Sequence, residues 1–398
     1  MLFAATLLGL ALNGPADAKN NKQYGPGVTD TEIKVGQTMP YSGPLSTYGT
    51  IGKAESAYFH MINEQGGVNG RKIVLVSLDD GYSPPRTLEQ TRRLVEQDQV
   101  LLLFNSFGTA PNAAIQPYLN ERGVPQLFPL SGATRWGDPE HFPWTIGFQP
   151  SLQVEGYAVA RYIRQQWPNA KIAVLYQNDD FGKDYMKGLA DGLGEVARRA
   201  IVGETSYETT DPTVDSQIVT LQASGADVLV NVSAGKFTAM AIRKAYQIGW
   251  RPSQFIFSGA STREAMLGLP RPGQAAGLIT AQWFKDPTDP TWRNDSAVGD
   301  WIAWMSKYYP EGDRTSVPNV AGYIGAMALV QVLRQCGDDL TRENVMRQAA
   351  NLDLELPILL PGIKVSTSPT QFFAVHEIAL KRFNGEVWES FGELSRMR

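Results

Sequence analysis

Short apolar runs alternate with longer amphipathic segments along most of this chain. The run 72–78 is apolar enough to predict a strand buried on both faces, whereas 51–65 repeats apolar residues at helical spacing and ends at Gly66-Gly67. The same reading predicts strands at 33–36, 72–78, 100–104, 124–128, 171–176, near 201, 227–232 and 254–257, and helices at 51–65, 87–97, 111–122, 152–166, 182–198, from about 214, and 237–249. This alternation predicts parallel sheets covered by helices, in numbers that exceed one open sheet. We therefore expect an α/β fold with two lobes.

The C-terminal part follows a different pattern. Segments 371–380 and 387–391 flank Phe383-Asn384-Gly385-Glu386, which predicts a strand, a turn and a second strand. No sequence repeat of fixed period is visible, which argues against a solenoid.

The first eighteen residues are typical of a secretory signal peptide. Residues 2–12 form an apolar run too short to span a bilayer as a helix, and Ala16-Asp17-Ala18 is an A-x-A cleavage pattern. No Lys or Arg precedes the run, and the alternatives are a membrane anchor or a buried N-terminal helix. We expect residues 1–18 to be cleaved, so that the mature chain begins near Lys19.

Composition then narrows the function classes. The 398 residues include 36 Lys and Arg against 40 Asp and Glu, a net charge of −4 that gives no electrostatic reason to bind nucleic acid. The single cysteine, Cys336, excludes an internal disulfide framework. The three histidines, His60, His141 and His376, are too far apart in sequence to predict a metal site. We expect neither a metal nor a cofactor.

Catalytic motifs are missing from the sequence. It contains no G-x-S-x-G elbow, HExxH, Walker loop or CxxC. The segment 49–53 resembles part of a phosphate loop but lacks the first glycine at the required spacing, so we interpret it as a helix cap. Asp79-Asp80 and Asp179-Asp180 close predicted strands, and we interpret both pairs as solvated strand ends rather than as metal or acid/base sites. We expect a protein that is not an enzyme.

Hydroxyl and glycine residues gather where predicted strands end and helices begin, in segments 104–111, 129–134 and 231–235. Ligands of open α/β sheets bind beyond the carboxyl ends of strands, where helix N-termini offer N–H groups suited to a carboxylate. N-capping explains any one of these segments, but three segments in two lobes favour a binding cleft. Aromatic residues stand at the same strand ends: Tyr41, Tyr48, Phe107, Trp136, Trp144 and Phe181.

Four motifs together carry a family resemblance: IKVGQTMPYSGPLSTYG, INEQGGVNGRKIVLVSLDDGYSP, GTAPNAAIQPYLNERGVPQLFPLSGAT and KIAVLYQNDDFGKDY. In their order and spacing they resemble the type I periplasmic solute-binding proteins of ABC importers, the group around the leucine/isoleucine/valine-binding protein. The resemblance runs from about Thr31 to the C-terminus. It implies a periplasmic protein with two lobes, each a parallel sheet flanked by helices, joined by three crossover hinges that close the lobes over a ligand.

The resemblance also implies a discontinuous division of the chain. Lobe one would comprise 31–149 and a return at 278–350, and lobe two would comprise 150–277 and a return at 351–398 that includes the C-terminal hairpin.

Ligand contacts are implied in the same way. Thr109 and the loop Leu130-Ser131-Gly132 match positions that hold a ligand carboxylate, Tyr48 matches an aromatic wall, and Phe181 matches an aromatic residue of lobe two that covers the ligand. The full set of expected ligand-binding residues is Tyr41, Tyr48, Phe107, Gly108, Thr109, Leu130, Ser131, Gly132, Phe181, Ala234 and Gly259.

Departures from the family pattern bear on the ligand. Amino-acid binders place an acidic residue in lobe two to hold the ammonium group, whereas the matching strand end here reads Phe257-Ser258-Gly259-Ala260. Ala234 stands where the family has a second aromatic residue, Leu152 where it has an aspartate, and the lone Cys336 replaces a disulfide. Burying an unpaired ammonium is costly. We therefore expect an apolar carboxylate without an amine, with aromatic acids such as benzoate or phenylpropenoid types favoured.

Three alternatives stay open. In the first, the protein binds branched-chain amino acids, and Asp79, Asp80, Asp179 or backbone carbonyls hold the ammonium group. In the second, it is a ligand sensor of the same fold. In the third, it is an exported α/β hydrolase, although no Ser-His-acid set is visible in the sequence.

The expected partners are a small-molecule carboxylate and the membrane permease of an ABC transporter, with no nucleic acid, and we expect a monomer. Whether Ser106, Tyr41, Arg135 and Trp136 reach the cleft also stays open. Arg135 would either pair with a second carboxylate of a diacid or lie on the surface.

Overall fold

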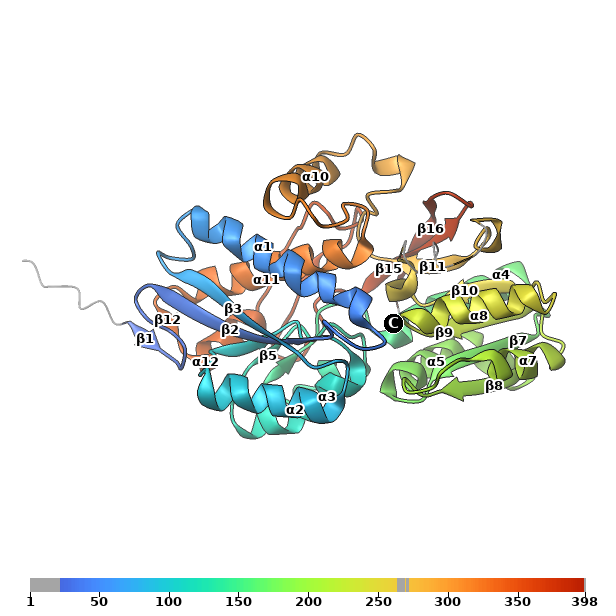
Figure 1. The fold of residues 1–398 in the computed structure, drawn as a ribbon, viewed down its shortest axis with the longest axis horizontal. Coiled ribbons are helices and arrows are strands. Elements are labelled where there is room, and N and C mark those ends of the chain that lie inside the picture. Colours follow the sequence, from blue (N-terminus) through green and yellow to red (C-terminus); the bar gives the residue numbers. More distant parts are fainter. Residues whose placement is uncertain (1–21, 263–268, 270–271, 397–398) are drawn as a thin grey trace, which may run out of the picture.

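The computed structural model describes residues 22–262, 269 and 272–396. It consists of two α/β bodies side by side, which confirms the predicted two-lobe fold (Figure 1). The predicted signal peptide, residues 1–18, lies outside the described residues. Within them, no helix combines the length and the apolar character needed to cross a membrane.

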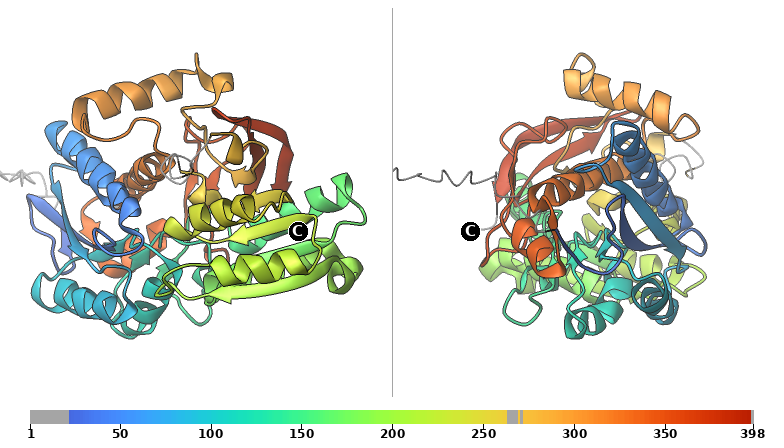
Figure 2. Two further views of the ribbon diagram at one scale, coloured as in Figure 1. Left: turned by 45° about the vertical axis from the view of Figure 1, so that its right-hand side comes forward. Right: turned by 90° about the vertical axis from the view of Figure 1, so that its left-hand side faces the viewer.

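The first body is built on a five-stranded parallel sheet in the order β3-β2-β4-β5-β6. Its strands are β2 (Glu32–Met39), β3 (Lys72–Asp79), β4 (Leu102–Phe104), β5 (Gln126–Leu127) and β6 (Thr145–Ile146). The helices that belong to it are α1 (Thr50–Glu64), α2 (Pro84–Arg92), α3 (Thr109–Glu121), α10 (Ser296–Tyr308), α11 (Val317–Cys336) and α12 (Arg342–Ala349). Helices α10 to α12 come from late in the chain, and α11 packs along α1 (Figures 1 and 2).

The second body is built on a seven-stranded sheet in the order β16-β15-β11-β10-β9-β7-β8. Its parallel strands are β7 (Ile172–Gln177), β8 (Ile201–Tyr207), β9 (Val228–Val232), β10 (Ser253–Ile256) and β11 (Ile279–Gln282). The C-terminal strands β15 (Glu377–Phe383) and β16 (Trp388–Arg396) pair antiparallel, which confirms the predicted hairpin. Its helices are α4 (Leu152–Gln166), α5 (Asp180–Leu193), α6 (Ala197–Ala200), α7 (Asp215–Ala223) and α8 (Lys236–Gln247).

Two small pairs of strands complete the described part. Strand β1 (Gln23–Tyr24) pairs with β12 (Asp339–Leu340), and β13 (Asp353–Leu354) pairs with β14 (Val365–Ser366).

The helix starts follow from local side-chain chemistry. Ser151 precedes α4 and accepts a hydrogen bond from the Val154 N–H, and Asp179 precedes α5 and accepts from the Phe181 and Gly182 N–H groups. Each cap satisfies N–H groups that have no acceptor within their own helix.

One prediction about a single element is wrong. Strand β3 is an edge strand with only Ile73 fully buried, so it is not covered on both faces. The predicted helix 87–97 is helical throughout: it is α2, which begins earlier at Pro84 and runs to Arg92, followed by a π-helical turn at Arg93–Gln97.

The chain passes between the two bodies three times: after β6, after β11, and between α12 and β15. Residues 279–282 form β11 in the second sheet, inside the range 278–350 that the resemblance assigned to lobe one. The other lobe boundaries stay predictions.

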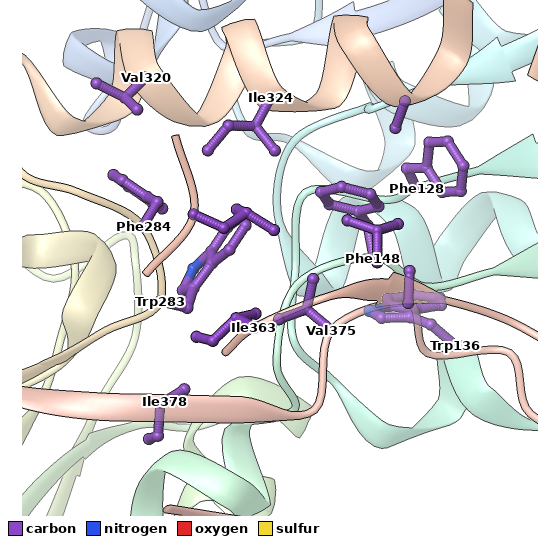
Figure 3. Close-up of a cluster of buried hydrophobic side chains, with 14 of the residues drawn as sticks. Phe128, Trp136, Phe148, Trp283, Phe284, Val320, Ile324, Ile363, Val375 and Ile378 are labelled. Atoms are coloured by element: carbon purple, nitrogen blue, oxygen red, sulfur yellow. The ribbon is translucent and has the colours of Figure 1, made fainter. Parts of the chain in front are cut away.

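Large buried side chains join the bodies near these crossings (Figure 3). The rings of Phe128 and Phe148 lie 5.0 Å apart, and Phe148 meets Trp283 at 6.0 Å, with Ile324 of α11 on one side and Ile378 of β15 on the other (Figure 3). The two sheets therefore share one apolar core on one side of the cleft.

Candidate functional site: the cleft between the lobes

A cleft of about 830 Å³, including the solvent at its mouth, lies between the two bodies. Its walls come from the loops after β2, β3, β4, β5 and β6 in the first sheet and after β7, β9, β10 and β11 in the second, together with the start of α11. The carboxyl ends of both sets of parallel strands thus face one space, which is where open α/β sheets bind ligands.

Two hydroxyl groups meet in the first-lobe wall of this cleft. Thr109 Oγ1 and Ser131 Oγ lie 2.7 Å apart, and Ser131 Oγ also accepts from Trp136 Nε1 at 3.0 Å and from Ala133 N at 3.2 Å. A hydroxyl has two acceptor lone pairs and one proton. Because both lone pairs of Ser131 Oγ are engaged, Ser131 donates to Thr109, and the Thr109 proton remains available to another acceptor.

The same wall contains the start of a helix. Thr109 is the first residue of α3, so its N–H and that of Ala110 have no acceptor within the helix and lie at the positive end of its dipole. Gly108 makes the close approach possible: its φ is +95°, and a Cβ there would lie 2.3 Å from Tyr82 Cε2. The donor groups of Thr109 are therefore held by rigid packing.

Aromatic pairs form the remainder of the wall on both sides. In the first lobe the rings of Tyr48 and Phe107 stack with centroids 4.7 Å apart. In the second lobe Phe181 and Phe257 meet edge to face at 4.8 Å. This arrangement suits a flat or branched apolar ligand.

A buried carboxylate lies behind the second-lobe wall. Glu155 of α4 accepts from Ser258 N at 2.8 Å and from Ser258 Oγ at 2.7 Å. Burial raises the pKa of Glu155 to about 7, against the opposing effect of these two hydrogen bonds. Ser258 itself lines the cleft, but Glu155 does not.

Hydrogen bonds cross the cleft from one lobe to the other. Tyr48 OH donates to the Gly259 carbonyl at 3.0 Å and accepts from Gly235 N at 3.4 Å, while Gln177 Nε2 donates to Tyr82 OH at 3.3 Å. The two lobes are therefore in contact around the cavity.

Further contacts lie at the rim. Asp184 of α5 accepts from Thr134 N at 2.7 Å and from Thr134 Oγ1, and Arg135 pairs with Asp180 at 3.1 Å. The described conformation is thus closed at the rim as well.

Ten of the eleven residues predicted to bind ligand line the cleft: Tyr48, Phe107, Gly108, Thr109, Leu130, Ser131, Gly132, Phe181, Ala234 and Gly259. Tyr41 does not. Its hydroxyl bonds to Ser77 Oγ at 2.7 Å beneath the wall, where burial raises the pKa of Tyr41 to about 12.

The other residues whose access to the cleft the sequence left undecided do not line it. Ser106 accepts from Thr38 N, Trp136 is buried behind Ser131, and Arg135 bonds to Gln116 and Asp180. Trp144 packs near Gly123.

Three lining residues, Leu152, Phe257 and Ser258, stand at positions that the sequence named only as departures from the family pattern. The lining residues that sequence reasoning missed are Leu45, Ile51, Tyr82, Gln149, Gln177, Gln282, Trp283, Phe284, Val317, Pro318 and Ala321. Strand β11 is missing from the predicted set, although the apolar residues before Gln282 are a signal for it. The carboxyl end of this strand places Gln282, Trp283 and Phe284 at the cleft.

The aspartates proposed as alternative ammonium partners are engaged elsewhere. Asp80 is buried and accepts from Tyr82 N and Thr87 Oγ1, and burial raises its pKa, so it is not a solvated strand end. Asp79 bonds to Ser42 and Arg86, and Asp179 caps α5. None of these three carboxylates lines the cleft. Among the described residues there is also no group of three or more His, Cys, Asp or Glu side chains placed to hold a metal.

Comparison with known proteins agrees with this architecture. A family model described as "Periplasmic binding protein" matches residues 32–385. A curated relative, Leu/Ile/Val-binding protein homolog 7 of Brucella abortus (strain 2308), is 25% identical over 326 residues, which cover 79% of each chain.

Two solved structures share the fold. A branched chain amino acid ABC transporter protein from Thermus thermophilus with bound valine is 17% identical, with a TM-score of 0.81 over 93% of this chain and 98% of its own. A solute binding protein of an ABC transporter from Rhodopseudomonas palustris BisB5, in complex with 3,4-dihydroxy benzoic acid, is 18% identical, with a TM-score of 0.76 over 93% of this chain and 99% of its own.

Proposed function

Because this chain belongs to the periplasmic binding protein family, we propose that it captures a small apolar carboxylate, preferably an aromatic acid, for import. It is a periplasmic binding protein of the ABC transporter type. Such proteins bind small-molecule ligands rather than catalyse reactions. The proposal concerns the chemical class of the ligand and the residues that hold it.

One observation carries the proposal: the cleft has hydroxyl and N–H donors but no charged side chain among the described residues that line it. The Thr109 hydroxyl and the N–H groups at the start of α3 suit a carboxylate. The ammonium of a free amino acid would face no carboxylate partner, and leaving it unpaired costs several kcal/mol, to order of magnitude. An acid without an amine avoids that cost.

The aromatic pairs of the two lobes support an aromatic ligand. Tyr48 and Phe107 on one side, with Phe181 and Phe257 on the other, offer ring faces and edges from opposite walls. Rings inserted between such walls stack or meet edge to face, at a gain of about 0.5–1.5 kcal/mol per pair beyond area burial.

Binding of a branched-chain amino acid is the second candidate. The name of the Brucella relatives and the valine bound to the Thermus protein favour it. Backbone carbonyls would then have to hold the ammonium, and one of them, that of Gly259, already accepts from Tyr48. A sensor of the same fold would share the ligand chemistry, and adjacent genes for permease and ATPase subunits would favour transport instead.

Export and partners complete the proposal. Residues 1–18 act as a signal peptide cleaved after Ala18, and the mature protein works in the periplasm as a monomer that delivers its ligand to a membrane permease. N-terminal sequencing of protein recovered from the periplasm tests the cleavage site, and light scattering after gel filtration tests the oligomeric state.

Thermal-shift and calorimetric titration test the ligand class. The mature protein is first unfolded and refolded to remove any co-purified ligand, then titrated with benzoate, cinnamate, medium-chain fatty acids, leucine and valine. We expect stabilisation by the aromatic acids, weaker stabilisation by the aliphatic acids, and none by the amino acids. Stabilisation by leucine or valine, with none by any acid lacking an amine, would overturn the proposal.

A further inference from the structure

A buried tryptophan that does not line the cleft is bonded to one of the two hydroxyls that do. Trp136 lies in the 3-10 turn Thr134–Gly137 between β5 and β6, within the apolar cluster that the two lobes share (Figure 3). Its indole N–H donates to Ser131 Oγ at 3.0 Å. An apolar side chain would serve packing alone, so the indole supplies something more, a donor aimed at the cleft wall.

The backbone around Trp136 fixes the direction of this N–H. Trp136 N donates to the Ala133 carbonyl at 3.2 Å, and the Trp136 carbonyl accepts from Gly147 N at 3.1 Å. The approach to Gly147 is close, since a Cβ there would lie 2.9 Å from Trp136 Cβ. The indole is therefore anchored on two sides, by the loop after β5 and by the loop after β6.

Arg135 connects the indole to the second lobe. Its guanidinium lies over the Trp136 ring, with Cζ 5.6 Å from the ring centroid, a geometry in which the cation is attracted by the ring face. Arg135 Nε donates to Gln116 Oε1 at 2.8 Å, and Nη1 bonds to Asp180 of the second lobe at 3.1 Å. Gln116 belongs to α3, the helix that begins at Thr109. Arg135 thus contacts α3, the indole and the opposite lobe at once.

We propose that Trp136 is a positioning residue for the ligand carboxylate and that Arg135 holds it in place from the rim. The proposal rests on the proposed function, in which the Thr109 hydroxyl donates to that carboxylate. The indole N–H takes one lone pair of Ser131 Oγ and the Ala133 N–H takes the other, so Ser131 donates to Thr109. Without the indole N–H, Ser131 has a free lone pair and can accept the Thr109 proton, which is then no longer available to the ligand.

The direction of this hydroxyl pair determines which head group the wall favours. A carboxylate only accepts hydrogen bonds, so it suits an outward hydroxyl that donates, whereas a carboxamide also brings two N–H donors that need acceptors. A site that leaves such donors unpaired rejects the ligand that carries them. Lobe closure contributes in the same way to the binding of an acid and of its amide, so it cancels in the ratio of their dissociation constants. This ratio, the acid preference, therefore reports the direction of the hydroxyl pair.

Calorimetric titration with acid and amide pairs tests the proposal. The pairs are benzoate with benzamide and cinnamate with cinnamamide, titrated into the refolded mature protein. We expect wild type to prefer the acid of at least one pair, and this preference to fall about fivefold or more in Trp136→Phe. Trp144→Phe, the same exchange at a tryptophan outside the cleft lining, should keep the wild-type preference. No preference in wild type, or an unchanged one in Trp136→Phe, overturns the positioning role, whereas failure of both acids to bind overturns the proposed function.

A double-mutant cycle tests whether Trp136 acts through Ser131. In Ser131→Ala the indole has lost its acceptor, so the addition of Trp136→Phe should change the acid preference by no more than about twofold. Loosened packing alone would lower the Tm and weaken the acid and the amide together, which leaves the preference unchanged. A further large fall of the preference in the double variant would mean that the indole acts by another route, and it would overturn the assignment.

Arg135 gives a second test that leaves the core intact and remains informative where Trp136→Phe does not fold. Arg135→Met removes the cation over the indole and the ion pair with Asp180, so the acid preference should fall about threefold. The control Arg122→Met removes a cation of the same kind, with Cζ 5.5 Å from the Tyr118 ring centroid and outside the cleft lining, and should keep the preference. A preference that survives in Arg135→Met overturns the role of Arg135.

Discussion

The hydroxyl of Thr109 shows how much one residue determines at this site. Ser131 Oγ is saturated by Trp136 and Ala133, so the direction of the hydrogen bond between the two hydroxyls is fixed and Thr109 keeps a free proton. Neither hydroxyl is charged, and the described residues that line the cleft include no charged side chain, so the site carries no charge until an anion enters. A neutral donor next to a helix N-terminus favours a carboxylate without attracting a cation.

Replacing Thr109 therefore tests the carboxylate contact directly. In Thr109→Val the shape is retained and the donor is lost, so affinity for the bound acid should fall by about 1.5–3 kcal/mol, roughly tenfold to a hundredfold in Kd. Thr109→Ser should restore most of the affinity. Thr220→Val, on the exposed face of α7, is the control and should bind as wild type. Calorimetric titration measures all three, and wild-type affinity in Thr109→Val would contradict the assignment.

A single buried glutamate, Glu55, makes the stability of the protein depend on pH. This side chain of α1 is completely buried and accepts from Gln37 Nε2 and Asn105 Nδ2. Burial raises the pKa of Glu55 to about 8, although the two hydrogen bonds act in the opposite direction. The folded protein therefore holds a proton on Glu55 at neutral pH, whereas the unfolded chain, with an ordinary glutamate pKa near 4.5, has lost it.

The free energy of unfolding should consequently fall as pH rises from about 4.5 to about 8, because the folded state binds more protons there. The contribution of this one group is at most about 1.4 kcal/mol per pH unit and levels off above pH 8. Chemical denaturation of wild type and Glu55→Gln at several pH values checks this, with exposed Glu89→Gln as control. Parallel stability profiles for wild type and Glu55→Gln would contradict the expectation.

Strand β15 of the second sheet is joined by a buried ion pair to the segment after β11, where the chain crosses between the lobes. Lys381 of β15 pairs with Asp286, which follows β11, at 2.9 Å, and both side chains are 1% exposed. Burial acts to raise the pKa of Asp286, but the Lys381 ammonium holds it below its usual range. The two buried charges therefore stabilise each other, and Thr288 donates two further hydrogen bonds to the Asp286 carboxylate.

Removal of one partner should destabilise the protein strongly. Lys381→Ala leaves Asp286 as an unpaired buried carboxylate, and we expect a loss of about 3–5 kcal/mol. The exposed pair of Lys364 and Glu355 provides the contrast, since Lys364→Ala should cost no more than about 1 kcal/mol. Urea denaturation of both variants measures the difference. Similar losses in the two would show that the buried pair is not what holds β15 to the crossing.

Sequence patterns predict elements well where the determinants are local. The helix at 152–166 appears with the predicted bounds because Ser151 caps it and its apolar spacing is regular. The pattern fails for β3, because an apolar run does not reveal whether a second strand lies beside it. Strand β11 is absent from the prediction, and its register with β10 and β15 depends on residues far away in sequence.

The difference between local and long-range determinants also explains which residues of the candidate site could be predicted from the sequence. The predicted residues that line the cleft stand at strand ends, where glycine and hydroxyl residues before a helix are visible in the sequence. Tyr41 belongs to such a loop too, but Ser77, on the neighbouring strand β3, draws its hydroxyl beneath the wall. Tyr82 and Gln177 meet only because two lobes face each other, and no local pattern indicates that.

For the whole molecule, affinity includes the equilibrium between open and closed lobes. If only part of the population is closed, the apparent Kd rises in inverse proportion to that fraction. Contacts that join the lobes outside the ligand site should therefore tune binding without touching the ligand. Asp184 of α5 is such a contact, since it accepts from the backbone and side chain of Thr134 in the opposite lobe.

Asp184→Ala removes this rim contact while every residue of the lining stays in place. The loss of one such hydrogen-bonded contact is worth about 1 kcal/mol, so we expect roughly a fivefold weaker apparent Kd, mostly through faster dissociation. Asp191→Ala on the same helix, which removes only an exposed pair with Lys187, is the control. Stopped-flow release measures the rate, and small-angle scattering without ligand should show a larger radius of gyration for Asp184→Ala. Unchanged release and unchanged scattering would mean that the rim does not contribute to closure and that the cleft residues alone hold the lobes together.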